Sequence, residues 1–498
     1  MTRRPAITKV LVANRGEIAV RVIRTCRDLG IATVAVYSEA DEGALHVRLA
    51  DEAYPIGSAA PAESYLRAER LIAVATRAGC DAVHPGYGFL SENADFAEAV
   101  AAAGLTFVGP PASVQRALGE KTSARRLAKA AGVPIAEGTL EPVEQEADAR
   151  AIAERIGYPL LLKPAGGGGG KGMRIVRGPD ELASAWRGAT GEAVTAFGAP
   201  ALLVERYLAG ARHIEVQLMA DDHGSVVWLG ERDCSIQRRH QKLVEETPGP
   251  SVDDALRARL GEAAVRIARA AGYRNAGTAE FLVAADGAFV FLEVNTRLQV
   301  EHPVTELVTG LDLVALQLRV AAGEPLPFAQ DAVARRGSAI ECRITAEDAF
   351  SGFLPAGGRL GLVRFPSGPG VRVDAGIETG MTVPDEYDPL LAKLIAWGPT
   401  RADAIARLRR ALRETVIAGV ATTVPFHQHV VADPEFVAGR YDTSYVETRW
   451  AGRRADLDGT ALTAAAAVAV LAARSAQRRA GPREGSAWLR SAREDALR

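Results

Sequence analysis

A run of glycines between two lysines is the first feature of this sequence that could do chemistry. Five consecutive glycines, residues 166–170, lie between Lys163 and Lys171. Glycine backbones let N–H groups approach and wrap an anion, and the lysines supply charge for phosphates. A flexible linker is the alternative, but apolar segments flank this run, whereas linkers usually have polar neighbours. The pattern predicts a phosphate-binding loop other than a P-loop, because Gly172 stands where that motif needs Ser or Thr.

A predicted β-hairpin carries two opposed carboxylates. Asp286-Gly287 lies between two alternating apolar runs, which is a strong hairpin signal. A two-residue loop would place Glu280 opposite Glu293, with Asn295 on the same face. Opposed like charges are unfavourable unless a cation lies between them, and these oxygens suit Mg²⁺ or Mn²⁺ carrying nucleotide phosphates.

This metal site depends on the length of the hairpin loop. A three-residue loop would shift the pairing by one residue, and two solvated carboxylates are the plainer alternative. The two-residue loop also predicts that the opposite, apolar face packs inward through Phe281, Val283, Val290 and Leu292.

The segment after the hairpin places a guanidinium, an amide and a carboxylate close together, on Arg297, Gln299 and Glu301. A small oxyanion substrate and a base would require such groups. Glu301 could equally be a charge at the start of a helix. The glycine-punctuated turn of residues 84–93 is as consistent with a structural turn as with a ligand contact.

Length and charge set the class of protein. The 498 residues predict about three domains, and 59 basic against 61 acidic residues give a net charge of −2. No basic field therefore points to nucleic acid or to an anionic membrane. The four cysteines lie far apart, so a disulfide framework is not expected and a reducing cytoplasm fits better. No signal peptide is expected at the N-terminus.

The elements that must position these groups follow from the apolar pattern. A strand from Ile7, a helix with Ile18, Val22 and Cys26 on one face, and a second strand over residues 31–37 predict a βαβ unit and a parallel sheet. Its turn lacks GxGxxG, which argues against a dinucleotide site. Further patterns predict a helix at 123–131, a buried strand at 158–164, a β-rich stretch at 338–396, a helix at 401–416, and a surface or packing helix at 461–473.

Six motifs together resemble biotin carboxylase, an ATP-grasp enzyme. They occur in the family's order over roughly residues 5–450, and they span residues 13–19, 84–93, 158–174, 231–242, 291–306 and 341–343. Carbamoyl-phosphate synthetase shares the glycine loop and the Glu-x-Asn signature, but not the combination at 84–93 and 231–242.

The resemblance implies an α/β fold, α+β overall. Its parts would be a Rossmann-like parallel-sheet domain, an ATP-grasp domain with a mobile glycine-rich lid, and a mixed α+β C-terminal domain. The expected boundaries are an N-terminal domain at 1–110, a linker at 111–135, the lid at 136–207, the ATP-grasp core at 208–330, the C-terminal domain at 338–450 and an Ala/Arg-rich tail at 451–498.

The resemblance also implies a reaction in two stages. MgATP phosphorylates bicarbonate to carboxyphosphate, and the resulting CO₂ is captured by N1′ of biotin. The residues implied to bind ATP are Lys121, Lys163, Gly167, Gly168, Gly169, Glu205, the backbones of Arg206 and Leu208, His213, Gln237, His240 and Leu282. Glu280, Glu293 and Asn295 match the metal positions.

The same resemblance assigns the bicarbonate and biotin contacts. Lys242, Arg297, Gln299 and the Val300 backbone would bind bicarbonate, and Glu301 would be the base. Arg343 would stabilise the enolate-like oxygen of biotin. Tyr87 and Gly88 match a turn that touches biotin.

The expected partners follow from the resemblance and from a missing motif. No methionine of the chain is followed by lysine, so a Met-Lys-Met biotinylation site is absent from the sequence. Biotin is therefore expected on a separate carrier protein, with a separate carboxyltransferase, as in an acyl-CoA carboxylase that serves fatty acid synthesis. A homodimer is implied by resemblance alone. The acceptor stays open between acetyl-CoA, propionyl-CoA, pyruvate and others. The competing hypotheses are another ATP-grasp carboxylate–amine ligase and a silent nucleotide-binding scaffold.

Overall fold

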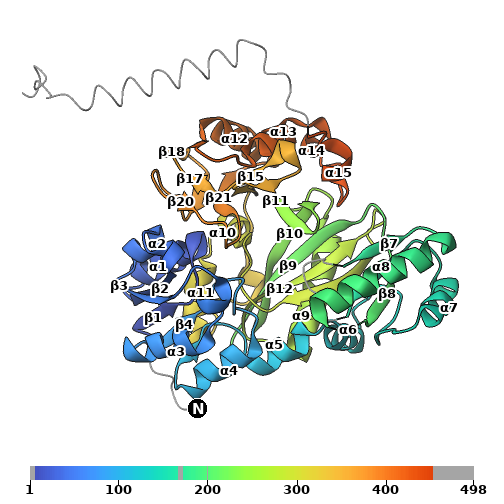
Figure 1. Cartoon of the computed structure of the whole chain (residues 1–498), viewed down its shortest axis with the longest axis horizontal. Coiled ribbons are helices and arrows are strands. Elements are labelled where there is room, and N and C mark those ends of the chain that lie inside the picture. Colours follow the sequence, from blue (N-terminus) through green and yellow to red (C-terminus); the bar gives the residue numbers. More distant parts are fainter. Residues whose placement is uncertain (1–5, 166–171, 199, 453–498) are drawn as a thin grey trace, which may run out of the picture. The chain divides into compact units, whose positions relative to one another are not determined.

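The computed structural model describes residues 6–165, 172–198 and 200–452 (Figure 1). The predicted glycine contacts at Gly167, Gly168 and Gly169 and the predicted helix at 461–473 lie outside the described residues. Residues 6–451 belong to one compact unit. Within the described ranges, no helix is long and apolar enough to cross a membrane.

The N-terminal part is a parallel five-stranded sheet in the order β3-β2-β1-β4-β5. The predicted βαβ unit is confirmed, because β1 and β2 pair in parallel and α1 connects them in the chain. Ile18, Val22 and Cys26 of α1 pack into the core against β1. The elements are β1 (Lys9–Val12), α1 (Gly16–Asp28), β2 (Ala32–Ser38), α2 (Leu45–Leu49), β3 (Glu52–Gly57), α3 (Ala68–Arg77), β4 (Ala82–His84), α4 (Ala94–Ala102) and β5 (Thr106–Phe107).

A small lobe follows, built on the antiparallel sheet β7-β6-β8. Helices α7 and α8 enclose its core with Leu160, Leu162 and Trp186 (Figure 1, right-hand side). The stretch that leads to it, expected as a linker, carries two helices, α5 and α6. The elements are α5 (Ala112–Gly119), α6 (Lys121–Ala130), α7 (Glu146–Ile156), β6 (Leu160–Pro164), β7 (Arg174–Val176), α8 (Pro179–Phe197) and β8 (Leu202–Arg206).

The largest sheet has eight strands in the order β13-β12-β9-β10-β11-β14-β21-β19. Because β11 pairs with β14, this sheet runs without a break from the central part of the chain into its C-terminal part. The elements up to this junction are β9 (Arg212–Ala220), β10 (Val226–Arg238), β11 (Gln241–Thr247), α9 (Asp254–Ala270), β12 (Asn275–Val283), β13 (Phe289–Asn295), α10 (His302–Thr309) and α11 (Leu313–Ala321).

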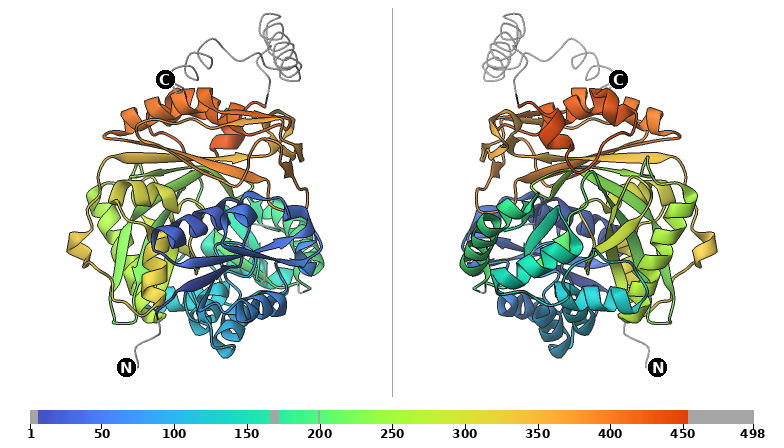
Figure 2. Two further views of the ribbon diagram at one scale, coloured as in Figure 1. Left: turned by 90° about the vertical axis from the view of Figure 1, so that its left-hand side faces the viewer. Right: turned by 90° about the vertical axis from the view of Figure 1, so that its right-hand side faces the viewer.

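Helices cover both faces of the C-terminal strands (Figure 2). Ile340 and Cys342 of β14 pack with Leu408 of α12, whereas Ala339 of β14 packs with Val304 and its neighbours on α10. The elements are β14 (Ser338–Thr345), β15 (Glu347–Asp348), β16 (Leu354–Pro355), β17 (Gly358–Arg359), β18 (Leu362–Arg364), β19 (Val371–Ala375), β20 (Thr382–Val383), β21 (Leu390–Gly398), α12 (Arg401–Glu414), β22 (Val416–Ala418), α13 (Val424–Ala432), α14 (Pro434–Val437) and α15 (Tyr445–Arg449).

The β12–β13 hairpin reaches the predicted register by a different route. Val283 pairs with Phe289, so the loop is one residue longer than the two-residue turn expected at Asp286-Gly287. A bulge then shifts the register by one residue, and Glu280 pairs with Glu293 after all. A bulge re-aims the side chains beyond it. It turns Glu293 onto the face of Glu280.

The longer loop also corrects the predicted apolar face. Phe289 and Phe291, rather than Val290 and Leu292, join Phe281 and Val283 in the core. Val290 and Leu292 are only half-buried. The reason is the one-residue shift, which exchanges the two faces of β13 between the loop and the bulge.

The phenyl cluster beneath the hairpin should carry much of its stability. Phe281 is 0% exposed and meets Phe289 and Phe291 edge-on, with ring centroids 5.5 and 6.2 Å away. We expect Phe281→Ala to cost about 3–5 kcal/mol, measured by urea unfolding. Leu292→Ala, at the half-buried bulge, is the matched control and should cost less than about 1.5 kcal/mol. Equal losses would contradict this account of the hairpin core.

Candidate active site

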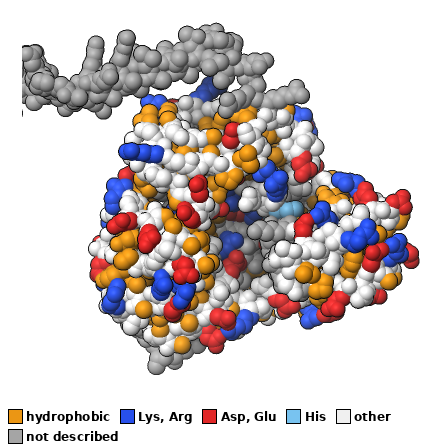
Figure 3. Space-filling view, in the orientation of Figure 1, with side chains coloured by type: hydrophobic (Ala, Val, Ile, Leu, Met, Phe, Trp, Pro, Cys, Tyr) orange, Lys and Arg blue, Asp and Glu red, His pale blue; other side chains and the backbone are white. Residues whose placement is uncertain are grey.

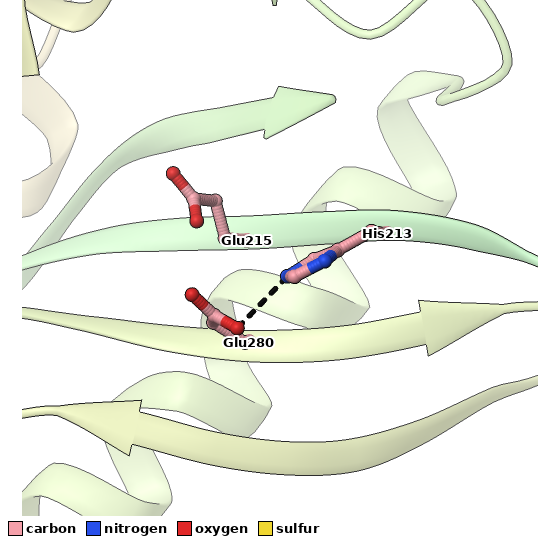
Figure 4. Close-up of side chains that lie close together, drawn as sticks. All are labelled: His213, Glu215 and Glu280. Carbon is pink, nitrogen blue, oxygen red and sulfur yellow. Dashed lines mark ion pairs between the residues drawn. The ribbon is translucent and has the colours of Figure 1, made fainter. Parts of the chain in front are cut away.

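A row of charged side chains crosses one face of the large sheet. Glu293 pairs with Glu280, Glu280 with Glu215, and Glu215 with Arg232, on the adjacent strands β13, β12, β9 and β10. Paired residues share a face, so these side chains lie side by side. Figure 4 shows Glu215 and Glu280 next to His213, whose Nε2 lies 2.9 Å from Glu280 Oε2.

Arg232 is the last residue of this row and lies buried inside the protein. It is 0% exposed, and its guanidinium donates to Glu215, Gln217, Thr278, Gln299 and Thr305 at distances of 2.5–3.2 Å. A buried charge is tolerated only when it is paired and hydrogen-bonded. This guanidinium therefore fixes three strands and the segment around α10 relative to one another.

Lys242 of β11 supplies the second cation. Its Nζ lies 2.6 Å from Glu215 Oε2, 2.8 Å from Glu280 Oε1 and 2.7 Å from Glu301 Oε1. Although burial opposes the charge, these carboxylates raise the pKa of Lys242 well above its ordinary value. His213, Glu215 and Glu280 are close enough to hold a metal ion. Lys242 Nζ lies within 2.8 Å of both Glu215 and Glu280, so these three residues form an ion-pair cluster. The metal site predicted from the sequence is a different pair, Glu280 with Glu293.

Glu301 lies between two cations. It precedes α10, and its carboxylate turns to Lys242 and Arg343 rather than to the helix N-terminus. Burial alone would raise the pKa of Glu301, but Lys242 and Arg343 hold it well below its usual range. Arg343 Nε also bonds Glu245 Oε1 at 2.6 Å, and burial raises the pKa of Glu245 to about 7. Glu301 is thus kept ionised, in the form that accepts a proton.

The predicted anion-binding groups lie in the same network. Arg297 Nε donates to Glu92 Oε2 at 2.9 Å, and its terminal nitrogen donates to Asn295 Oδ1 at 3.0 Å. Gln299 Nε2 donates to Glu280 Oε1 at 2.8 Å, while its oxygen accepts from Arg232. Each of these predicted bicarbonate contacts is therefore held in place by a neighbour.

The predicted metal ligands have a donor set that fits Mg²⁺ or Mn²⁺. Burial and the adjacent Glu280 raise the pKa of Glu293, which indicates a carboxylate short of positive charge. Asn295 Nδ2 donates to Glu280 Oε1 at 2.9 Å, which leaves its amide oxygen turned toward Arg297. A divalent cation between Glu280 and Glu293 would relieve their repulsion.

The predicted nucleotide residues gather beside this face. Lys163 forms an ion pair with Glu205, which also accepts from Arg125 Nη1 at 2.8 Å. Burial lowers the pKa of Lys121, with Lys163 adding to the effect and Glu293 opposing it. Because the Glu205 carboxylate is engaged and the Arg206 N–H donates to Glu137 O at 2.7 Å, an adenine contact here would use other atoms of these residues.

The remaining predicted nucleotide contacts lie on neighbouring strands. Leu282 pairs with His213, and Gln237 pairs with Lys242. His240 lies in the β10–β11 turn with φ +64°, and burial lowers its pKa, with His213 and Lys163 adding to the effect. Leu208 follows β8 in the small lobe.

The predicted biotin turn lies at the carboxyl end of β4. Asn14 Nδ2 donates to the carbonyl oxygens of Pro85 and Tyr87 at 2.8 and 2.7 Å, which fixes the turn. Gly88 has φ +69°, a conformation that favours glycine. The Tyr87 hydroxyl donates to Glu17 of α1.

The space-filling view shows a hollow between the small lobe and the rest of the chain, in which acidic, basic and histidine side chains are visible (Figure 3). The predicted metal, bicarbonate and base residues Glu280, Gln299, Lys242 and Glu301 are joined in one hydrogen-bonded network on the large sheet. Ligands of α/β proteins bind in such crevices.

Sequence reasoning missed roles for Glu215 and Arg232. Part of the signal for Glu215 was in the sequence, because His213, Glu215 and Gln217 alternate with apolar residues. Only the structure shows that every residue of β9 except Arg212 is buried. Polar side chains on a fully buried strand face require partners. That requirement points to a site.

Replacing the buried guanidinium should damage the whole cluster. We expect Arg232→Lys to cost about 3–5 kcal/mol, because lysine cannot supply the same fork of donors and leaves buried acceptors unpaired. Thermal unfolding measures the loss. Arg319→Lys, in a half-exposed pair with Glu324 at 2.8 Å, is the control and should change stability by at most about 0.5 kcal/mol. A similar melting midpoint for both variants would show that Arg232 is not essential to the cluster.

Comparison with known proteins identifies the family. Residues 6–114 match the family model "Biotin carboxylase, N-terminal domain", 120–329 match "Carbamoyl-phosphate synthase L chain, ATP binding domain", and 341–448 match "Biotin carboxylase C-terminal domain". The chain is 51% identical over 439 residues to a biotin carboxylase of Nostoc, covering 88% of this chain and 98% of the relative. It is 51% identical over 440 residues to a pyruvate carboxylase subunit of Methanothermobacter thermautotrophicus, covering 88% and 89%.

Solved structures agree with this fold. The biotin carboxylase domain dimer of Hydrogenobacter thermophilus 2-oxoglutarate carboxylase, in complex with MgADP, ADP and bicarbonate, superposes with a TM-score of 0.86 at 46% identity, covering 89% of this chain and 98% of that one. With the parallel N-terminal sheet, the central sheets within the part that matches the ATP-binding model, and the C-terminal strands, the chain belongs to the biotin carboxylase family of ATP-dependent ligases.

Proposed function

We propose that this chain carboxylates biotin carried on a separate protein, as the first half-reaction of an acyl-CoA carboxylase. The observation that carries the proposal is the position of Glu301 between Lys242 and Arg343, at 2.7 and 2.8 Å. The two cations keep Glu301 ionised, and they would bind a small anion and stabilise the charge that develops when Glu301 takes its proton.

In the proposed first stage, bicarbonate binds at Lys242, Arg297, Gln299 and the Val300 backbone. Glu301 accepts the bicarbonate proton, and the freed oxygen attacks the γ-phosphorus of ATP, so that ADP leaves and carboxyphosphate forms. Lys121 and Lys163, with Gly167, Gly168 and Gly169, hold the phosphates. The nucleotide is surrounded by Glu205, Arg206, Leu208, His213, Gln237, His240 and Leu282. Mg²⁺ or Mn²⁺, held by Glu280, Glu293 and Asn295, would supply charge neutralisation for the phosphates.

In the proposed second stage, carboxyphosphate breaks down to CO₂ and phosphate, the phosphate takes the proton from N1′ of biotin, and N1′ then attacks CO₂ to give carboxybiotin. Arg343 stabilises the oxygen of deprotonated biotin, and Tyr87 with Gly88 contacts the ring. Neither step requires Arg343 or Lys242 to lose a proton. Both can therefore remain charged throughout.

The partners and the acceptor are proposals as well. Carrier and carboxyltransferase subunits would complete the enzyme, and the chain would act as a homodimer in the cytoplasm. The dimer of the Hydrogenobacter domain supports the proposed homodimer. An oxo-acid carboxylase is the second candidate, because one relative of 51% identity belongs to a pyruvate carboxylase. Co-purification followed by a screen of acetyl-CoA, propionyl-CoA, pyruvate and 2-oxoglutarate as acceptors decides between them.

The base can be tested by one substitution. Glu301→Gln should lower bicarbonate-dependent ATP cleavage by about 10²- to 10⁴-fold, because the side chain keeps its shape and loses its proton acceptor. Nucleotide affinity, measured by calorimetry, should stay near the wild-type value. Glu324→Gln, on a half-exposed glutamate, serves as the control and should leave turnover unchanged. Normal turnover of Glu301→Gln would show that another group is the base.

The role of Arg343 can be tested by comparing two activities. Arg343→Ser should lower biotin carboxylation about tenfold or more beyond any loss in bicarbonate-dependent ATP cleavage, because the proposed cation acts in the second stage. Both rates are measured on the same preparation, with free biotin as acceptor. Equal losses in the two rates would contradict the assignment.

A further inference from the structure

A buried lysine lies directly beneath the proposed biotin and base residues. Lys393 of β21 is 0% exposed and pairs across the sheet with Arg343 of β14, so both side chains leave the sheet on the same face. Two adjacent cations repel each other unless acids compensate them. Arg343 is compensated by Glu245 and Glu301, which leaves Lys393 to other partners.

Lys393 finds those partners in two distant segments. Its Nζ donates to the Val300 carbonyl oxygen at 2.9 Å and lies 3.1 Å from Glu17 Oε2. The next nearest carboxylate oxygen in its ion pairs belongs to Asp374 at 3.9 Å. Val300 immediately precedes Glu301. The hydrogen bond from Lys393 to the Val300 carbonyl therefore fixes the peptide group between Val300, whose backbone is proposed to bind bicarbonate, and Glu301, the proposed base.

The contact with Glu17 leads to the biotin turn. Glu17 is 3% exposed, in the first turn of α1, and its other oxygen accepts the Tyr87 hydroxyl. Lys393 Nζ also lies 5.9 Å from the centroid of the Tyr87 ring. Burial raises the pKa of the Glu17 carboxyl, and Lys393 opposes that rise. The ammonium thus favours the charged acceptor that holds Tyr87.

We propose that Lys393 is a positioning residue that holds the biotin turn and the loop of the base in one geometry. It reaches the turn through Glu17 and Tyr87, and the loop through the Val300 carbonyl. The assignment rests on the proposed roles of Tyr87 and Glu301. A displacement of about 1 Å in such groups can lower a rate by about 100-fold.

Lys393→Met tests the proposal, because methionine fills similar space and removes the ammonium. We expect the KM for free biotin to rise about tenfold and kcat for biotin carboxylation to fall about 10- to 100-fold. The KM for ATP should change less than about twofold, since the proposed nucleotide contacts lie on other strands.

A double variant separates positioning from mere stability. Lys393→Met leaves Glu17 buried without its cation, which should lower the melting midpoint. Adding Glu17→Gln removes that unpaired charge, so the midpoint should recover while the KM for biotin stays raised. Recovery of both together would show a purely structural role and overturn the proposal.

Two further variants keep the test decisive. Glu17→Gln alone removes one charge without a change of shape, and it should raise the KM for biotin about threefold or more even if Lys393→Met does not fold. Lys9→Met is the matched control, because Lys9 of β1 also bonds a carboxylate and a carbonyl, at Glu52 of β3 and at Ala78 O (2.7 Å) after α3, within the N-terminal part of the chain. Its kinetics should match wild type.

The wild-type arm distinguishes the two proposals. A wild-type protein without bicarbonate-dependent ATP cleavage would overturn the proposed function and, with it, this assignment. An active wild type together with an unchanged KM and kcat for biotin in the folded Lys393 and Glu17 variants would overturn the positioning role alone.

Discussion

The interaction on which the rest of the site depends is the neutralisation of buried carboxylates by Arg232 and Lys242. Glu215, Glu280 and Glu301 are each at most 4% exposed, and uncompensated they would repel one another in a medium that screens charge poorly. Arg232 binds Glu215 from one strand, and Lys242 binds all three from another. The sheet can bury these acids because both cations are present, and Arg343 adds a further cation at Glu301.

This constraint explains why the proposed catalytic groups come from so many elements. Each acid needs a cation from a different strand, and each cation needs several acceptors. The strands β9 to β14 and the loop before α10 are therefore tied to one geometry. Preorganised charge of this kind is what stabilises developing charge most effectively, because little rearrangement is needed at the moment of reaction.

The same electrostatics holds the C-terminal strands against the N-terminal part. Arg21 of α1 and Arg372 of β19 share Glu306 of α10, with distances of 2.8 and 2.7 Å. Lys393 adds its contacts with Glu17 and Val300. Segments that are hundreds of residues apart thus meet around α10. The site is formed at this junction, and its geometry depends on contacts that no single motif contains.

Local patterns in the sequence determined the βαβ unit, the buried strand before the glycine run, the hairpin and the family motifs, because turn chemistry and apolar periodicity act over a few residues. They also predicted that Glu280 faces Glu293. Only the tertiary structure decided how that pairing arises, since the longer loop and the compensating bulge depend on how Phe289 and Phe291 pack beneath the strand. It likewise decided which cation meets which acid. Arg232, Lys242 and Lys393 find partners on strands and loops far along the chain, and burial, which makes those pairings obligatory, exists only in the folded molecule.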